Sequence, residues 1–167
     1  MPEIVANGVR LHVQRLAPSH RPHTSTQPVV FIHGLGMDNM SSYYYTLANP
    51  VAQAGAEVIL YDLRGHGLSE RPSTGYQVAD SVADLAGLLD ALGIDGPVHL
   101  VGNSYGGTVA LSFAVRYPHR VASMVLIEAH FTVAGWAEQV AAERDRIGST
   151  VAGGDLRGWL DQLGRKV

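Results

Sequence analysis

The chain has 167 residues, of which 46% are hydrophobic and 16% charged, and it contains no cysteine. This length and apolar content predict a globular domain with a sizeable core rather than a disordered segment. A net charge of −3 gives no basic surface for nucleic acid or an anionic membrane, and the lack of cysteine excludes disulfides, thiolate metal sites and a cysteine nucleophile.

The N-terminal segment predicts a β-hairpin. Glu3–Ala6 and Val9–Leu16 are β-prone runs on either side of Asn7-Gly8, a dipeptide that suits a two-residue turn because both central positions need positive φ. Neither a signal peptide nor a run of about 20 apolar residues, as a membrane span requires, is visible. We therefore expect a soluble, cytoplasmic protein.

Strands and helices alternate from residue 29 onward. Four short runs predict strands: 29–32, 57–61, 97–101 and 121–127. The first is an unbroken apolar run, as expected of a strand covered on both faces. Three segments between them predict helices that end near Gly or Pro: 41–54, 78–92 and 105–117. Alternation with short connections predicts an α/β fold with a mostly parallel sheet flanked by helices.

The pattern changes after residue 127. The segments 136–147 and 155–163 predict helices, and no further strand follows. We therefore divide the chain into 1–129, the N-terminal part of an α/β core, and a helical segment, 130–167.

The segment Gly102-Asn103-Ser104-Tyr105-Gly106-Gly107 follows a predicted strand and opens a predicted helix. In that context G-x-S-x-G predicts a sharp turn that holds the serine exposed and strained, so Ser104 is the candidate nucleophile. Side chains in place of Gly102 and Gly106 would collide across so tight a turn. The backbone N–H of Tyr105, at the start of the helix, is a candidate oxyanion donor. The alternative is a plain glycine-rich turn.

Two further motifs follow strands. His33-Gly34-Leu35-Gly36 predicts a loop whose Leu35 N–H is the second oxyanion donor, with His33 shaping the loop. The alternative is that the glycines only turn the chain. The stretch 62–69, Asp-Leu-Arg-Gly-His-Gly-Leu-Ser, predicts a hydrogen-bonded loop in which Asp62 and Arg64 fix the backbone, although charged residues at a strand end can also be catalytic.

Together and in this order, the three motifs resemble the α/β-hydrolase family, over about residues 2–127. The resemblance implies that Ser104 is the nucleophile, that Leu35 and Tyr105 donate to the oxyanion, and that 130–167 begins a helical cap. Serine at position 104 argues against haloalkane dehalogenase and epoxide hydrolase activity, which in this family use aspartate there. The motif Gly-Asn-Ser-x-Gly-Gly is similar to the motif of hydrolases that cleave carbon–carbon bonds of ring-fission products. It is also similar to the motif of ordinary esterases.

The family's acid and histidine follow the nucleophile in the chain, on loops after later strands that this sequence lacks. Glu128, at the end of the last predicted strand, is an alternative acid, and His130 is a weaker candidate for the base. The unpaired last strand would also leave a sheet edge open. We therefore expect a complementary C-terminal segment or chain, or self-association.

The function expected from these observations is hydrolysis of an ester, a thioester or an activated carbon–carbon bond in a small molecule, through an acyl-enzyme on Ser104. Neither a metal ion nor an organic cofactor is expected. Two alternatives stay open. One is a non-hydrolytic protein of the same fold that binds a ligand or catalyses cyclase or lyase chemistry. The other is an inactive fragment that acts through a partner chain.

Overall fold

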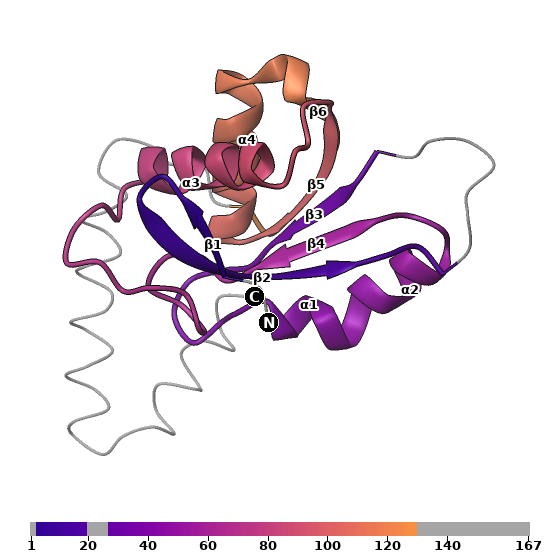
Figure 1. Cartoon of the computed structure of the whole chain (residues 1–167), viewed down its shortest axis with the longest axis horizontal. Coiled ribbons are helices and arrows are strands. Elements are labelled where there is room, and N and C mark those ends of the chain that lie inside the picture. The colour runs from indigo at the N-terminus through magenta and orange to yellow at the C-terminus, as the bar shows by residue number, and fades with distance from the viewer. Residues whose placement is uncertain (1–2, 20–26, 130–167) are drawn as a thin grey trace, which may run out of the picture. The chain divides into compact units, whose positions relative to one another are not determined.

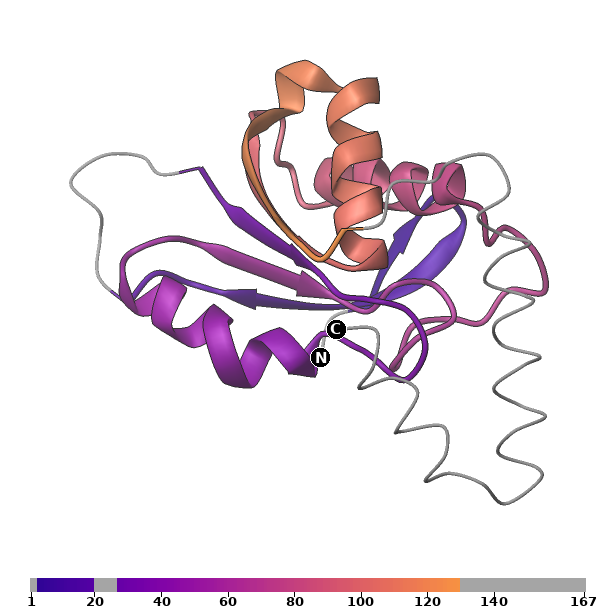
Figure 2. The same cartoon turned by 180° about the vertical axis from the view of Figure 1, so that it is seen from behind.

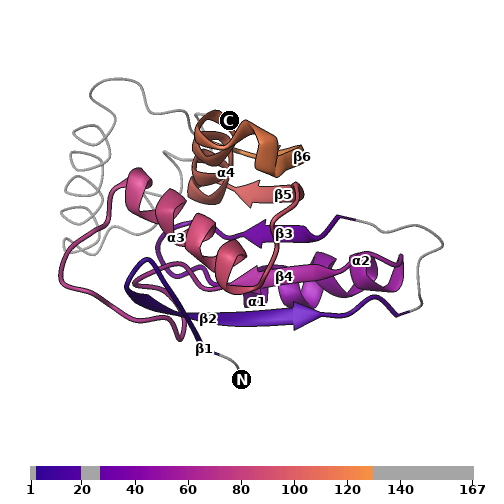
Figure 3. The ribbon, with the colours of Figure 1, turned by 45° about the horizontal axis from the view of Figure 1, so that its top comes forward.

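A six-stranded mixed sheet organises residues 3–19 and 27–129, the part of the chain that this computed structural model describes (Figure 1). The strands follow the order β1-β2-β4-β3-β5-β6 across the sheet (Figure 3). The pairs β3–β4, β3–β5 and β5–β6 are parallel, and the pairs β1–β2 and β2–β4 are antiparallel. The bounds are β1 Glu3–Ala6, β2 Val9–Leu16, β3 Val29–Ile32, β4 Val58–Tyr61, β5 Val98–Asn103 and β6 Val121–Ile127. The predicted α/β class is thus confirmed.

The turn between β1 and β2 has the predicted hairpin geometry. Asn7 and Gly8 both have positive φ, 48° and 76°. Such a turn matches the twist of the two strands that it joins.

Helices cover both faces of the sheet (Figures 1 and 2). On one face, α3 (Val78–Ala91) and α4 (Tyr105–Arg116) pack on the main core, and a 3₁₀ turn, η2 (Pro118–Arg120), leads from α4 into β6. The opposite face carries the consecutive segments α1 (Ser41–Tyr43), η1 (Tyr44–Ala48) and α2 (Asn49–Gln53). A smaller core lies beneath these segments, built on Phe31, Tyr43, Ala48, Val58 and Leu60.

The predicted helix over 41–54 is helical to Gln53, but Tyr44–Ala48 forms a wider π-helical turn. Pro50 accounts for it, because proline has no N–H to donate to the carbonyl four residues earlier and its ring clashes with that carbonyl. A wider turn moves the earlier carbonyl away from the proline ring.

The strand β6 lies at the edge of the sheet and pairs only with β5 among the described strands. On the face that carries α1 and α2, the side chain of Val125 is 54% exposed and Ile127 is also exposed. The described elements therefore leave the β6 part of this face uncovered.

Within residues 3–19 and 27–129, no helix is long and apolar enough to cross a membrane. The helices predicted over 136–147 and 155–163, and also His130, lie outside the described residues. The division at residue 129 and the cytoplasmic location stay predictions.

Candidate active site

Ser104 occupies the turn between β5 and α4 in a strained backbone conformation, with φ 50° and ψ −116°. Positive φ is uncommon for a residue with a side chain and costs about 1–3 kcal/mol, so neighbouring contacts must hold it. The Ser104 N–H donates to the Ile127 carbonyl at the end of β6, at 2.8 Å. Its carbonyl accepts from the N–H groups of Gly107 and Thr108, at 3.0 and 3.2 Å. The sharp turn predicted from G-x-S-x-G is present.

Two glycines permit this turn because other backbone atoms lie very close to them. A Cβ on Gly102 would lie 2.4 Å from the Gly106 carbonyl oxygen, as expected for a collision across the turn. A Cβ on Gly106 would instead lie 2.0 Å from the carbonyl oxygen of Ile32, at the end of β3. The absence of a side chain at Gly106 therefore brings the start of α4 against the end of β3.

The loop His33-Gly34-Leu35-Gly36 continues from β3 and lies beside Ser104. A Cβ on Gly34 would lie 3.5 Å from the Ser104 Cβ. Among the described residues, no acceptor takes the backbone N–H of Leu35 or of Tyr105. The Tyr105 N–H is also at the first position of a 12-residue helix, where the helix dipole favours negative charge. This arrangement can stabilise an oxyanion formed on a carbonyl attacked by Ser104.

Asp38 fixes the loop His33-Gly34-Leu35-Gly36, a role that our sequence analysis missed. Its carboxylate accepts the N–H of Gly34 at 2.7 Å, the N–H of Asn39 at 2.9 Å, and the hydroxyl of Ser42. Burial alone would raise the pKa of Asp38, but these three hydrogen bonds outweigh it, and the pKa lies below its ordinary value. The only signal in the sequence was an aspartate in a glycine-containing loop, where it commonly accepts backbone N–H groups.

His33 is fully buried and joins two loops, in agreement with the structural role predicted for it. The Leu63 N–H donates to Nε2 at 2.9 Å, so this nitrogen is unprotonated, and Nδ1 lies 2.7 Å from the Gly34 carbonyl oxygen, to which it donates. Burial lowers the pKa of His33, and the nearby His66 lowers it further. The imidazole is therefore neutral when it links the loop at Gly34 to the loop after β4.

We expect stability to fall through His33 as the pH is lowered from neutral past its unfolded pKa of about 6.5. Its folded pKa lies below the unfolded value of about 6.5, so the unfolded chain takes up the proton first as the pH falls. The contribution of His33 is complete above that unfolded value and is lost as the pH falls toward the folded pKa. Urea unfolding midpoints across this range should drop less in His33→Gln than in the wild type. The exposed His119→Gln is the control, and equal pH dependence in all three proteins would contradict the assignment.

The loop after β4 has the structural role predicted for Asp62 and Arg64. The Asp62 carboxylate accepts the N–H groups of Met40 and Leu68, both at 2.9 Å. The Arg64 guanidinium donates to both carboxylate oxygens of the buried Asp84 on α3, and these bonds raise its pKa. Asp84, which the sequence analysis did not single out, therefore anchors this loop to the main core.

Glu128 follows Ile127, the residue whose carbonyl accepts the Ser104 N–H. Its φ is 48° and its side chain is exposed. The structure thus brings Glu128 to the same end of the sheet as Ser104, and its role as an acid stays a prediction. In the described part of the chain, no group of three His, Asp or Glu side chains is placed to hold a metal ion.

Comparisons with known proteins agree with this geometry. A family model described as alpha/beta hydrolase fold matches residues 27–163. The chain is 44% identical over 103 residues to 2-hydroxy-6-oxo-2,4-heptadienoate hydrolase of Pseudomonas putida, which covers 61% of this chain and 37% of the relative.

Two solved structures are similar over about three quarters of the chain. A meta-cleavage product hydrolase from Pseudomonas fluorescens has a TM-score of 0.67 and 33% identity, covering 77% of this chain and 45% of that one. An esterase from Exiguobacterium antarcticum has a TM-score of 0.66 and 29% identity, covering 76% of this chain and 44% of that one. The chain thus spans less than half the length of these relatives.

Proposed function

The chain belongs to the alpha/beta hydrolase fold family, and from this membership we propose that Ser104 is the nucleophile of a hydrolase acting on small molecules. The observation that carries the proposal is the position of Ser104 in a strained turn, with the Gly34 loop alongside it. A strained turn held by hydrogen bonds on both sides is a feature that folds retain at functional sites.

The geometry suits acyl transfer. The Ser104 Oγ attacks the substrate carbonyl carbon, its proton passes to a base, and the carbonyl electron pair moves onto the oxygen. The N–H groups of Leu35 and Tyr105 stabilise that oxyanion. When the carbonyl re-forms, the bond to the leaving group breaks, the leaving group takes a proton, and an acyl-enzyme remains. Water then hydrolyses the acyl-enzyme and frees Ser104.

The substrate class we propose is a small keto-dienoate in which the carbon–carbon bond beside the ketone is cleaved. Support comes from the relative at 44% identity, whose name specifies hydrolysis of 2-hydroxy-6-oxo-2,4-heptadienoate. The similar esterase structure favours a second candidate, a carboxylic ester. Both substrates present a carbonyl carbon to the same nucleophile, and they differ in the leaving group.

A serine hydroxyl needs a base to accept its proton, and the base needs an orienting acid. Among the described residues, no side chain is hydrogen bonded to the Ser104 hydroxyl, and His33 is already committed to Gly34 and Leu63. We propose that the base and the acid come from further polypeptide, a C-terminal segment or a second chain, that pairs with the exposed edge of β6. Glu128 is the alternative acid.

A fluorophosphonate probe tests the assignment of the nucleophile. We expect an active preparation of the protein to be labelled at Ser104, because the probe reacts only with an activated serine. Ser104→Ala should abolish both labelling and turnover of a keto-dienoate or an ester. Ser112→Ala, on the same helix, is the matched control and should be labelled as the wild type is.

The intact mass of the labelled species identifies the source of the base. A chain longer than 167 residues, or a second polypeptide bound to it, agrees with the proposal. Labelling that survives Ser104→Ala, or turnover without labelling of Ser104, would overturn the nucleophile assignment. Binding of a substrate without turnover by the complete protein would favour a non-hydrolytic role instead.

A further inference from the structure

A second candidate site lies between β2 and the first residues of the helical segment that starts at Ser41. A cavity of about 550 Å³ opens there, within the range of typical small-molecule sites. Ser104, Gly34 and Leu35 do not line it, so it is separate from the nucleophile site. Its wall includes His12, Gln14, Met40, Tyr44, Tyr45 and Leu68.

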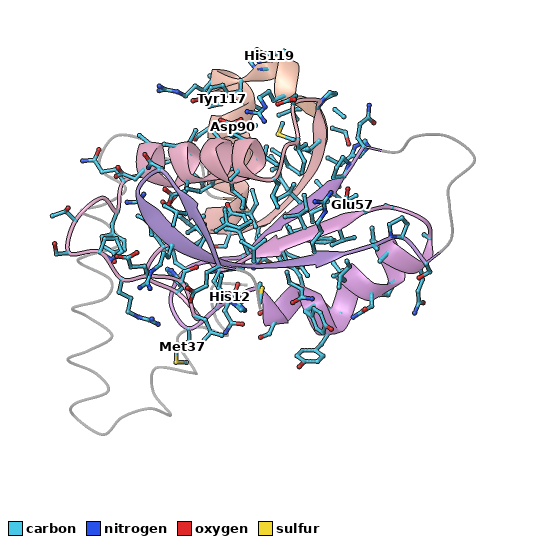
Figure 4. All side chains as sticks on the ribbon, viewed as in Figure 1. His12, Met37, Glu57, Asp90, Tyr117 and His119 are labelled. Atoms are coloured by element: carbon cyan, nitrogen blue, oxygen red, sulfur yellow. The ribbon has the colours of Figure 1, made fainter. Side chains whose placement is uncertain are left out.

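His12 contributes a polar imidazole to the wall of this cavity. The residue is only 5% exposed and lies beneath β2, close to the start of α1 (Figure 4). Its backbone N–H donates to the Ser69 hydroxyl and its carbonyl accepts from Asp62, but its ring nitrogens have no hydrogen-bond partner in the described part of the chain. These nitrogens are not among the buried unpartnered atoms of the described residues, so they are open to the cavity and can hydrogen bond to a ligand there.

The rest of the wall is mostly apolar and partly aromatic. The side chains of Tyr45 and Leu68 are 81% and 69% exposed, which is high for large hydrophobic groups. The rings of Tyr44 and Tyr45 meet edge to face at a centroid distance of 5.1 Å, a packing that a further aromatic ring can extend. A mainly apolar wall with a few convergent polar groups is typical of a small-molecule site.

The negative charge of Asp62 limits the kinds of ligand that this cavity can bind. The Asp62 carboxylate also lines the cavity, and it is already occupied by the N–H groups of Met40 and Leu68. A second negative charge beside it would be repelled, so a carboxylate or phosphate ligand is disfavoured. A neutral hydroxyl group can hydrogen bond to the imidazole of His12 and is not repelled by the Asp62 carboxylate.

We propose that this cavity binds a neutral phenol-like molecule. Its hydroxyl hydrogen bonds to the imidazole of His12, and its ring packs against Tyr44, Tyr45 and Leu68. Binding at this position leaves Ser104 free, so the proposal does not depend on the hydrolase function.

Titration of the complete protein with 4-ethylphenol, followed by backbone amide chemical shifts, tests the proposal. We expect saturable shifts at Ser41, Tyr44 and Tyr45, and the same affinity in Ser104→Ala. At neutral pH, the anionic 4-ethylbenzoate and the purely apolar ethylbenzene should each bind at least about fivefold more weakly, because one is repelled and the other lacks the hydrogen bond.

Substitutions in the cavity wall test whether 4-ethylphenol binds in this cavity. His12→Phe keeps the ring shape, removes the hydrogen bond and should weaken 4-ethylphenol binding by about fivefold. Leu68→Ala and Tyr45→Ala remove exposed wall atoms, so they test the site even if His12→Phe fails to fold. Leu47→Ala is the control, because Leu47 is an exposed leucine that does not line the cavity. Absence of saturable shifts, or equal affinity in the three wall variants, would overturn the proposal.

Discussion

Replacing Gly106 with alanine is expected to destabilise the fold by about 3 kcal/mol or more, at the upper end of what overpacking costs. The added Cβ would lie 2.0 Å from the Ile32 carbonyl oxygen and 2.6 Å from that of His33. Both are backbone atoms at the end of a central strand, so neither can rotate away as a flexible side chain would. The start of α4 must therefore move away from β3, which also displaces Ser104 from the loop at Gly34.

Urea unfolding of Gly106→Ala and the wild type measures this effect. Gly96→Ala is the matched control, because a Cβ there meets no atom within 4 Å and its φ needs no glycine. The control should change the free energy of unfolding by less than about 1 kcal/mol. If Gly106→Ala unfolds at the same urea concentration as Gly96→Ala, the close approach of α4 to β3 described above is wrong.

Asp84→Ala is expected to lower the free energy of unfolding by about 3–5 kcal/mol, because it leaves the Arg64 charge buried without a partner. The two side chains are 1% and 6% exposed, and the guanidinium meets both carboxylate oxygens. Asn7 also donates to this carboxylate, at 3.0 Å, so the same substitution removes a second hydrogen bond.

A double-mutant cycle separates the ion pair from general packing. Asp95→Ala, at an exposed position after α3, is the control and should change stability by about 0.5 kcal/mol or less. Adding Arg64→Met to Asp84→Leu should restore part of the loss from Asp84→Leu alone, because no buried charge then remains. Additive losses in the double variant would show that the pair is not coupled in the way its geometry indicates.

Much of the fold follows from local patterns in the sequence. The hairpin was predictable because Asn-Gly supports positive φ at both turn positions, and Asn7 and Gly8 adopt it. The strained turn at Ser104 was predictable because the glycines around it mark a strand-to-helix turn that ordinary side chains would block. In both cases, the signal and the structure that it specifies lie within a few residues of one another.

The features that the sequence did not reveal depend on contacts between distant segments. Asp84 anchors the loop after β4 only because the fold brings α3 beside it, 20 residues further along the chain. The hydrogen bond from Gly34 to Asp38 is local, but its importance comes from the position of Gly34 beside Ser104, which is set by the contact of α4 with β3. Met37, which lies between Gly34 and Asp38 in the sequence, is exposed, so it does not indicate that this loop contacts the rest of the fold (Figure 4).

The hydrogen bond from Ser104 to Ile127 has a consequence for the order of events during synthesis. The strand that carries Ile127 is the last of the six to leave the ribosome. A nascent chain that ends before this strand carries all three sequence motifs, but its serine turn lacks the bond that fixes one side of it. The strained turn at Ser104 is therefore held on both sides only late in translation, once the last described strand has formed.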